Sequence, residues 1–175
     1  SVSYGYLYNN TITSKEDARK DFLDRFELPE IDGELTFENY IAKNMFVGER
    51  TILQGNRYGF IEPLEATSLQ FYQDLCRQAW DGMFSIQPVE VCNDKIRRTM
   101  KAIETFILWH YQYGSKYDTP FWEYAKSLPF NPDDKFYEMK NNKNIDDMEN
   151  SKDIDDEEYG QWQKWSFDTW RNGVE

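Results

Sequence analysis

The chain has 175 residues, of which 39% are apolar and 17% aromatic, and its formal net charge is −12. This length suggests one domain or part of a larger one, and so acidic a chain without a Lys/Arg cluster is a poor partner for nucleic acid. One histidine and two cysteines without a CxxC pair exclude a zinc site, and no apolar run is long enough to cross a membrane. The first residues are not a signal peptide, so we expect a cytoplasmic protein that binds neither metal ions nor membranes.

The first part of the chain combines strand signals with one helix. Residues 3–13 are rich in aromatic and β-branched types and predict a strand that is already under way where the sequence begins. Ser14 has the character of an N-cap, and the apolar spacing after it predicts a helix over 15–26. Residues 34–55 then predict two or three short strands interrupted by glycines.

From residue 67 the apolar period changes from two residues to about 3.6, which predicts helices. The first helix starts at Thr67 or Ser68 and closes at Gly82, and Cys76 on its apolar stripe is expected to be a small buried thiol. This stripe consists of Leu69, Tyr72, Cys76, Ala79 and Trp80.

The next helix has the clearest periodicity, with a cap at Asn93 or Asp94 and a stop at Gly114. Its apolar stripe consists of Ile96, Met100, Ile103, Ile107 and His110. The segment YDTPFWEYAKSL predicts a short capped helix with proline in its first turn. Residues 141–158 are acidic and predict a long solvated loop or a disordered segment, after which an aromatic stretch predicts a last helix.

The stretch GFIEPLEATSLQ, residues 59–70, places two glutamates in an otherwise apolar segment. The free N–H groups of a helix beginning at Thr67 form an anion site, and Glu65 stands just before it. A carboxylate beside an anion site makes sense if the two groups face different cavities. The alternative is a plain strand-to-helix connection in which Glu65 caps the helix, and composition alone favours that alternative.

Four segments of the chain are similar to the flavin-dependent tryptophan halogenases. GFIEPLEATS resembles the signature of that family, an apolar run and an acid followed by P-L-E-S-T-G, and RTILQGNRY occupies the place of the buried strand before it. ILWHYQYGSKYDTPFW resembles the family's H-Y…D-(T/S)-P-F-W segment, and GYLYNNTITSKEDARKDFLDRF resembles a strand and helix of the family. The resemblance covers residues from about 4 to about 128, and no motif of the family follows residue 130.

The resemblance implies roles for the residues of the signature. Glu65 matches the catalytic glutamate, which orients the halogenating agent and stabilises or deprotonates the cationic ring intermediate. Thr67 and Ser68 match the pair whose backbone amides bind halide beside the flavin. Ala66 stands where serine is usual and Ser68 where glycine is usual, which puts halide preference and efficiency in question.

The second motif implies a substrate wall. Phe121 and Trp122 match the aromatic pair that stacks on indole, and stacking would fix the edge that the ring presents to the oxidant. His110 and Tyr111 match positions near the amino-acid end of tryptophan, and Tyr117 falls where the family has a backbone contact. By their own patterns, without the resemblance, His110 and Trp122 are better explained as core residues.

The resemblance predicts an α+β fold that is mostly helical: a C-terminal helical substrate domain with a few strands of a larger FAD-binding α/β halogenase fold. We expect strands and one helix over 1–66 that complete the core, a helical substrate-binding region over 67–130, an acidic loop over 131–158 and a C-terminal helix over 159–175. No G-x-G-x-x-G or W-x-W-x-I-P is present, so the N-terminal FAD-binding half is expected to be missing.

The implied cofactors are reduced FAD and a halide ion, chloride or bromide. The implied partners are an aromatic small-molecule substrate and a flavin reductase, and a homodimer is compatible with the sequence. This chain alone is expected to be inactive. Two alternatives are a non-catalytic aromatic-binding module on the same scaffold and a fragment of a hydroxylating flavin monooxygenase.

Overall fold

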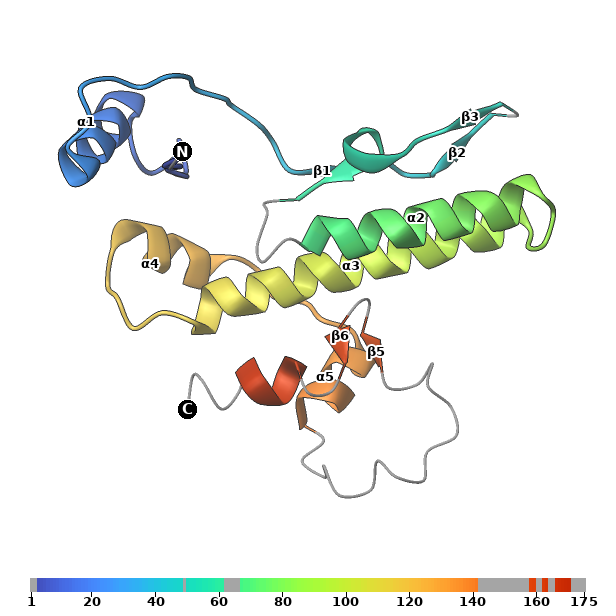
Figure 1. The fold of residues 1–175 in the computed structure, drawn as a ribbon. Coiled ribbons are helices and arrows are strands. Elements are labelled where there is room, and N and C mark those ends of the chain that lie inside the picture. The colour runs from blue at the N-terminus through green and yellow to red at the C-terminus, as the bar shows by residue number, and fades with distance from the viewer. Residues whose placement is uncertain are drawn as a thin grey trace.

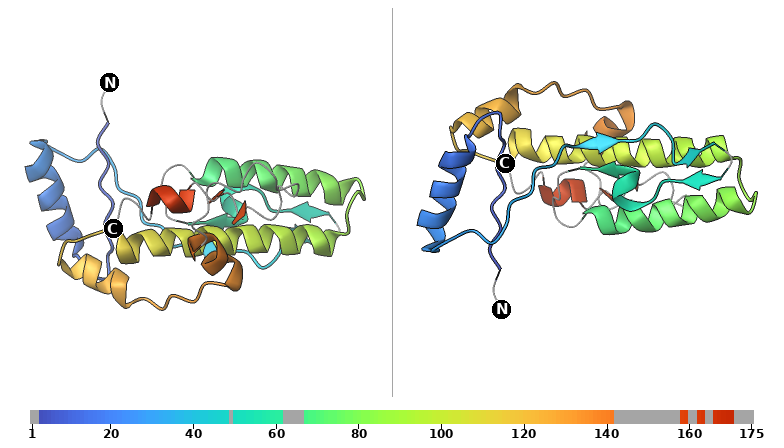
Figure 2. Two further views of the ribbon diagram at one scale, coloured as in Figure 1. Left: turned by 90° about the horizontal axis from the view of Figure 1, so that it is seen from below. Right: turned by 90° about the horizontal axis from the view of Figure 1, so that it is seen from above.

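The computed structural model describes residues 3–48, 50–61, 67–141, 158–159, 162–163 and 166–170. Its centre is an antiparallel pair of helices, α2 (Thr67–Met83) and α3 (Val89–Tyr113), with short strands over one side of the pair (Figure 1). The other side is covered by α5 (Asp134–Asn141), the strands β5 (Glu158–Tyr159) and β6 (Trp162–Gln163), and helical residues 166–170 (Figure 2). The predicted fold class, mostly helical with a few strands, is confirmed.

The N-terminal helix is confirmed, but the strand before it is not. Helix α1 spans Lys15–Phe26, and the Ser14 hydroxyl accepts a hydrogen bond of 3.1 Å from an amide of the first turn, as an N-cap does. Residues 3–8 are not part of any strand pair in the described chain, so the expected strand over 3–13 is wrong. A strand requires a hydrogen-bonded neighbour, whereas here the rings of Tyr4 and Tyr6 pack on α1.

The strands predicted over 34–55 are present and very short. They are β1 (Tyr40–Ile41), β2 (Phe46–Val47) and β3 (Thr51–Ile52), and β4 (Gly59–Phe60) follows a turn of 3₁₀ helix over Gly55–Arg57. Strand β1 pairs with β4 and β2 with β3, both antiparallel. Gly48, at φ 62°, lies in the β2–β3 connection and adopts a left-handed conformation that favours glycine.

Helix α2 buries a different face from the predicted one. The expected thiol burial is wrong, because Cys76 is exposed whereas Cys92 of α3 is fully buried. Leu69 and Trp80 are also exposed, at 67% and 59% of their surfaces. The buried residues of α2 are Phe71, Leu75, Gln78 and Ala79. The two faces differ by about one residue of helical rotation, and the packing of α3 and the strands selects between them.

Helix α3 begins earlier than predicted. Its N-cap is Pro88, so the expected cap at Asn93 or Asp94 is wrong, while the stop at Gly114 is confirmed. Asn93 is instead buried inside the helix, where its side-chain oxygen accepts hydrogen bonds from the amides of Met45 and Phe46 at 2.8 Å and 3.0 Å. A residue type that often caps helices therefore anchors the start of β2 to α3.

Two apolar clusters hold these elements together. The first lies between the strands, α2 and α3, and it includes four of the predicted stripe residues of α3, namely Ile96, Met100, Ile103 and Ile107. The second joins the opposite side of α3 to α5 and residues 166–170, and it consists of Ala102, Phe106, Trp109, Phe136, Met139 and Phe167. Because α3 contributes to both clusters, its buried residues occupy two of its faces.

The C-terminal region departs from the prediction. The helix expected over 159–175 is wrong in its first part, since β5 pairs with β6 before residues 166–170 become helical. Part of the expected acidic loop is helix α5, and residues 142–157 lie outside the described residues. The short helix after the T-P-F-W motif is confirmed as α4 (Pro120–Ser127), with its N-cap at Thr119. None of the described helices is long and apolar enough to cross a membrane.

Candidate active site

The predicted halide amides lie at the start of a helix, as expected. Glu65 and Ala66 belong to residues 62–66, which lie outside the described residues. The chain enters this segment from Ile61, next to β4, and leaves it at Thr67, the first residue of α2. The first amides of α2 have no acceptor within the helix, and the first turn contains no acidic residue that would repel an anion.

A cavity of about 200 Å³ adjoins this connection. Ile61 and Ser68, which flank the segment on both sides, line it together with residues of β4, α2 and α3. The other described lining residues are Asn56, Gly59, Phe60, Phe71, Tyr72, Met100 and Ile103. Among the described residues the cavity therefore has a mixed lining, in which Asn56, Ser68 and Tyr72 carry a hydroxyl or an amide.

A hydrogen bond links two of the polar lining residues. The Tyr72 hydroxyl of α2 donates to the side-chain oxygen of Asn56, which lies in the 3₁₀ turn before β4. The bond therefore ties α2 to the segment that leads into the strand before the signature. The sequence alone did not single out Asn56 or Tyr72 as site residues; they stand just outside the signature stretch 59–70, on either side of it.

Three of the predicted substrate residues come together. The ring centroid of Tyr111 lies 5.8 Å from that of Phe121 and 6.0 Å from that of Trp122, and the latter two are 5.0 Å apart. All three side chains are half-buried, so part of each ring remains accessible. Pro120 at the start of α4 sets the direction of the helix that carries two of these rings. We call Tyr111, Phe121 and Trp122 the ring wall.

The ring wall and the cavity belong to one side of α3. Tyr111 and Ile61 both pack against the first cluster, which contains the cavity-lining Met100 and Ile103. Helix α4 lies beside the C-terminal half of α3, past the start of α2 (Figure 1). The cavity and the ring wall are therefore linked through one apolar cluster on the same side of α3.

His110 packs against aromatic rings outside the ring wall. Its Nδ1 is 2.7 Å from the carbonyl oxygen of Phe106, and its imidazole lies 3.7 Å, between centroids, from the ring of Trp170, with the two planes tilted by 30°. It also contacts the rings of Phe106 and Trp109. Successive residues of a helix point about 100° apart, so His110 faces the second cluster while Tyr111 faces the first.

Tyr117 lies in the loop between α3 and α4. Its side chain is 74% exposed, and its backbone N–H donates to the Ser115 hydroxyl at 3.1 Å. None of the ring contacts found in the described chain joins Tyr117 to the ring wall.

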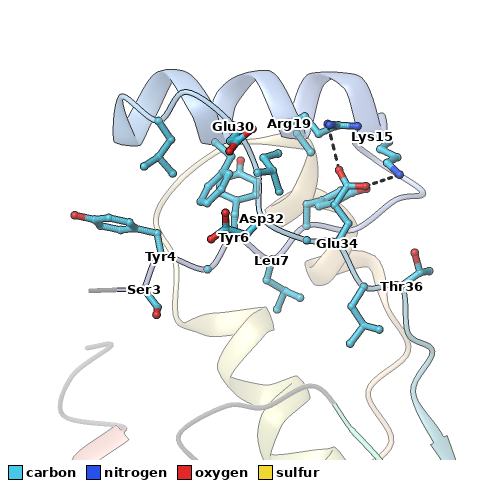
Figure 3. Close-up of a pocket in the computed structure, with 18 of the residues that line it drawn as sticks. Ser3, Tyr4, Tyr6, Leu7, Lys15, Arg19, Glu30, Asp32, Glu34 and Thr36 are labelled. Atoms are coloured by element: carbon cyan, nitrogen blue, oxygen red, sulfur yellow. Dashed lines mark ion pairs between the residues drawn. The ribbon is translucent and has the colours of Figure 1, made fainter. Parts of the chain in front are cut away.

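A larger cavity, of about 650 Å³, lies between residues 3–8, α1 and residues 28–37 (Figure 3). Near it, Lys15 and Arg19 reach the carboxylate of Glu34 at 2.5 Å and 3.2 Å. The hydrogen bond from Lys15 is the main cause that holds the pKa of Glu34 below its ordinary value. Among the described residues, none of the predicted catalytic, halide or substrate residues lines this cavity, so we place the candidate site at the smaller cavity and the ring wall.

One titratable residue next to the smaller cavity is fully buried. Tyr58 is fully buried and packs on Phe71, which lines the smaller cavity. Burial raises the pKa of its phenol above the ordinary value, and the charge of Arg97 offsets this in part.

In the described residues, no group of three or more His, Cys, Asp or Glu side chains is arranged to hold a metal ion.

The fold and these motifs define a halogenase-type chain. It belongs to the tryptophan halogenase family, whose sequence model matches residues 1–170. The tryptophan 7-halogenase RebH of Lentzea aerocolonigenes is 28% identical over 134 residues, which are 71% of this chain and 24% of that protein.

Two solved structures show the same fold. The thermophilic tryptophan halogenase Th-Hal from Streptomycin violaceusniger has a TM-score of 0.67 at 20% identity, over 97% of this chain and 34% of that one. A tryptophan C-6 flavin-dependent halogenase (chlorinase) from taromycin biosynthesis has a TM-score of 0.60 at 19% identity, over 78% of this chain and 28% of that one. The chain therefore spans between a quarter and a third of the length of these relatives. The predicted family resemblance is confirmed.

Proposed function

We propose that this chain is the substrate-binding part of a flavin-dependent halogenase that replaces an aromatic C–H bond by a carbon–halogen bond. The observation that carries the proposal is the arrangement along α3. Ile61 and Ser68, which stand on either side of the signature glutamate in the sequence, line the cavity, and Ile61 and Tyr111 of the ring wall pack against the same apolar cluster on α3. Membership of the tryptophan halogenase family supports the reaction type.

The residues present fit a halide ion and the edge of a flavin. The amides at the start of α2 supply the donors that an anion requires, in a first turn without acidic residues. Ser68 lines the cavity, so its side chain occupies part of the space that glycine would leave there. Without G-x-G-x-x-G, the chain supplies only this side of an FAD site.

When bound, reduced FAD consumes O₂, a halide ion and a proton, and supplies hypohalous acid, FAD and water. The halogenation step then balances within the substrate chamber. The ring's electron pair forms the carbon–halogen bond as the oxygen–halogen bond breaks, and the oxygen leaves as hydroxide, which becomes water by taking up the proton that Glu65 removes from the ring. In this proposal Glu65 orients the electrophile and accepts the ring proton, because a carboxylate stabilises the positive charge that develops on the ring.

The ring wall holds the substrate. Tyr111, Phe121 and Trp122 present half-buried aromatic faces from two helices that pack together, which restricts the orientation of a planar ring stacked against them. A ring held in one orientation offers one edge to the oxidant, which lowers the entropic cost of the reaction. The resemblance places His110 and Tyr111 near the amino-acid end of the substrate and Tyr117 at a backbone contact.

The test uses the complete protein with FAD, a flavin reductase, NADH, chloride or bromide and an aromatic substrate, with products detected by mass spectrometry. We expect halogenated product that requires halide, whereas a monooxygenase would give a hydroxylated product without it. Glu65→Gln is expected to reduce the rate by at least about a hundredfold while substrate binding is retained. This chain alone is expected to give no product, and a non-catalytic binding module would give none even in its complete form.

A further inference from the structure

We infer that residues near the C-terminus position the ring wall. Trp170 and His110 hold the last turn of α3 from the side of the second cluster, and that turn sets where Tyr111 and α4 place their rings. The inference rests on the proposed function where it concerns the substrate, because the ring wall is the proposed substrate surface. It is carried by the contacts between three C-terminal rings and one face of α3.

Three aromatic side chains near the C-terminus pack along α3. The contacts, given as distances between ring centroids, are Trp162–Phe106 at 4.2 Å, Phe167–Trp109 at 5.5 Å and Trp170–His110 at 3.7 Å. Phe106, Trp109 and His110 are three and four residues apart, so they share one face of the helix. The contacts therefore follow α3 towards its C-terminal end, which is the end that carries Tyr111 of the ring wall.

The last of these contacts reaches the residue at which α3 ends. Gly114 is the C-cap of α3, and its N–H donates to the carbonyl oxygen of His110 at 2.8 Å. A Cβ built on Gly114 would lie 2.4 Å from the Trp170 ring, so the indole occupies the space that a larger residue would fill. Trp170 therefore packs against the cap and against the imidazole of the last turn at once.

The imidazole of His110 is held on two sides. Its Nδ1 is 2.7 Å from the carbonyl oxygen of Phe106, one turn earlier in the same helix. A carbonyl oxygen only accepts, so Nδ1 is the donor in this contact. With this hydrogen bond on one side and the Trp170 ring on the other, the imidazole fixes the distance between α3 and the C-terminal residues.

The ring wall depends on the same turn of α3. Tyr111 of the ring wall directly follows His110. The next residue, Gln112, is buried, and its Nε2 donates to the carbonyl oxygen of Leu128, the C-cap of α4, at 2.6 Å. Helix α4 is therefore attached to α3 at this turn, and a shift of the turn moves Tyr111 and α4 together, because close-packed side chains adjust little on their own.

A displaced ring wall would change which edge a stacked ring presents to the oxidant. Displacements of about 1 Å are enough to lower a rate strongly when reacting atoms must be aligned. Trp170 and His110 are therefore positioning residues, which act on the substrate through Tyr111 and α4.

The first experiment measures the ring wall in this chain without any ligand. The tryptophans are labelled with 5-fluorotryptophan, and the fluorine-19 resonance of Trp122 is assigned by its loss in Trp122→Phe. Trp170→Ala is expected to shift and broaden this resonance, because the space left beside Gly114 frees the end of α3. His110→Ala is expected to have the same effect, and the double variant to add little to either. An unchanged Trp122 resonance in Trp170→Ala would overturn the inference.

Met139→Ala is the matched control. Met139 is buried in the same second cluster, but it lies on α5. Its truncation is expected to destabilise the chain while the Trp122 resonance stays in place. Equal shifts in Met139→Ala and Trp170→Ala would overturn the inference, because the resonance would then report a general loosening of the cluster. Trp170→Phe keeps a ring against His110 and is expected to restore most of the original resonance.

The second experiment measures the consequence in the complete protein, with free tryptophan as the probe. Calorimetry gives its Kd, and chromatography with mass spectrometry gives the ratio of halogenated isomers. Trp170→Ala is expected to raise the Kd by about tenfold and to turn one main isomer into a mixture, whereas Met139→Ala changes neither. A Kd and an isomer ratio that both stay unchanged in Trp170→Ala would overturn the inference. Absence of product from the unmodified protein would refute the proposed reaction, while the fluorine resonance would still decide the positioning.

Discussion

The buried amide of Asn93 makes the clearest prediction about stability. Its side-chain oxygen accepts from the amides of Met45 and Phe46, at 2.8 Å and 3.0 Å, and it is only 7% exposed. Asn93→Ala removes the acceptor and leaves two N–H groups without it, one of them on the fully buried Met45. Each buried donor left unpaired costs about 1–2 kcal/mol, and alanine returns about 0.6 kcal/mol of helix propensity. The free energy of unfolding is therefore expected to fall by about 2–3 kcal/mol.

The assay is urea unfolding of the chain followed by far-ultraviolet circular dichroism. With a slope of about 2 kcal/mol per molar urea, the midpoint is expected to fall by about 1–1.5 M. Asp94→Ala is the matched control, since it removes an exposed carboxylate that pairs with Arg97 at 2.6 Å on the same turn of α3. Exposed pairs contribute about 0–1 kcal/mol, and the propensity gain offsets part of that. A midpoint shift for Asn93→Ala no larger than that of Asp94→Ala would refute the reasoning.

Three further predictions concern exposure, packing and pH. Burial, reinforced by a nearby aspartate, raises the pKa of the buried Cys92 thiol, whereas Cys76 is exposed. Iodoacetamide at pH 8 is therefore expected to label Cys76 in the folded protein and Cys92 only after unfolding in urea. Equal labelling of both thiols without urea would contradict this. Gly114→Ala places a methyl group 2.4 Å from an indole ring and is expected to cost about 1–3 kcal/mol in thermal unfolding, whereas Gly33→Ala, with no atom within 4 Å, should cost less than half of that. The hydrogen bond from Lys15 and the charge of Arg19 lower the pKa of Glu34. The two ion pairs therefore stabilise the fold above the ordinary glutamate pKa, and this stabilisation is lost as the pH falls through the lowered value. A carbon-13 titration that gives a pKa of 4.5 or more for the Glu34 carboxyl would be inconsistent with the ion pairs.

Part of the candidate site could be predicted from local sequence. The start of α2 at Thr67 follows from the change in apolar period, and the start of α4 from Thr119 and Pro120. The motifs also named the three residues of the ring wall, although nothing in their spacing required the rings of Tyr111 and Trp122 to meet. That contact exists because α4 folds back beside the end of α3.

The sequence by itself determined the elements whose signals are local: the Ser14 cap of α1, the Gly114 stop of α3 and the long stripe of α3. These depend on hydrogen bonds and periodicity within a few residues of the chain. Only the tertiary structure decided which face of α2 is buried. The two candidate faces differ by one residue of helical rotation, and packing against α3 and the strands determines which of them is buried.

The tertiary structure also decided which contacts the side chains of Asn93 and His110 make. Both have side chains with several common roles, and the outcome depends on which backbone or ring another part of the chain brings near. Met45 lies 48 residues before Asn93, and Trp170 lies sixty residues after His110, so no local pattern contains either contact. The strand expected over residues 3–13 failed for the same physical reason, since a strand exists only where a neighbour supplies its hydrogen bonds.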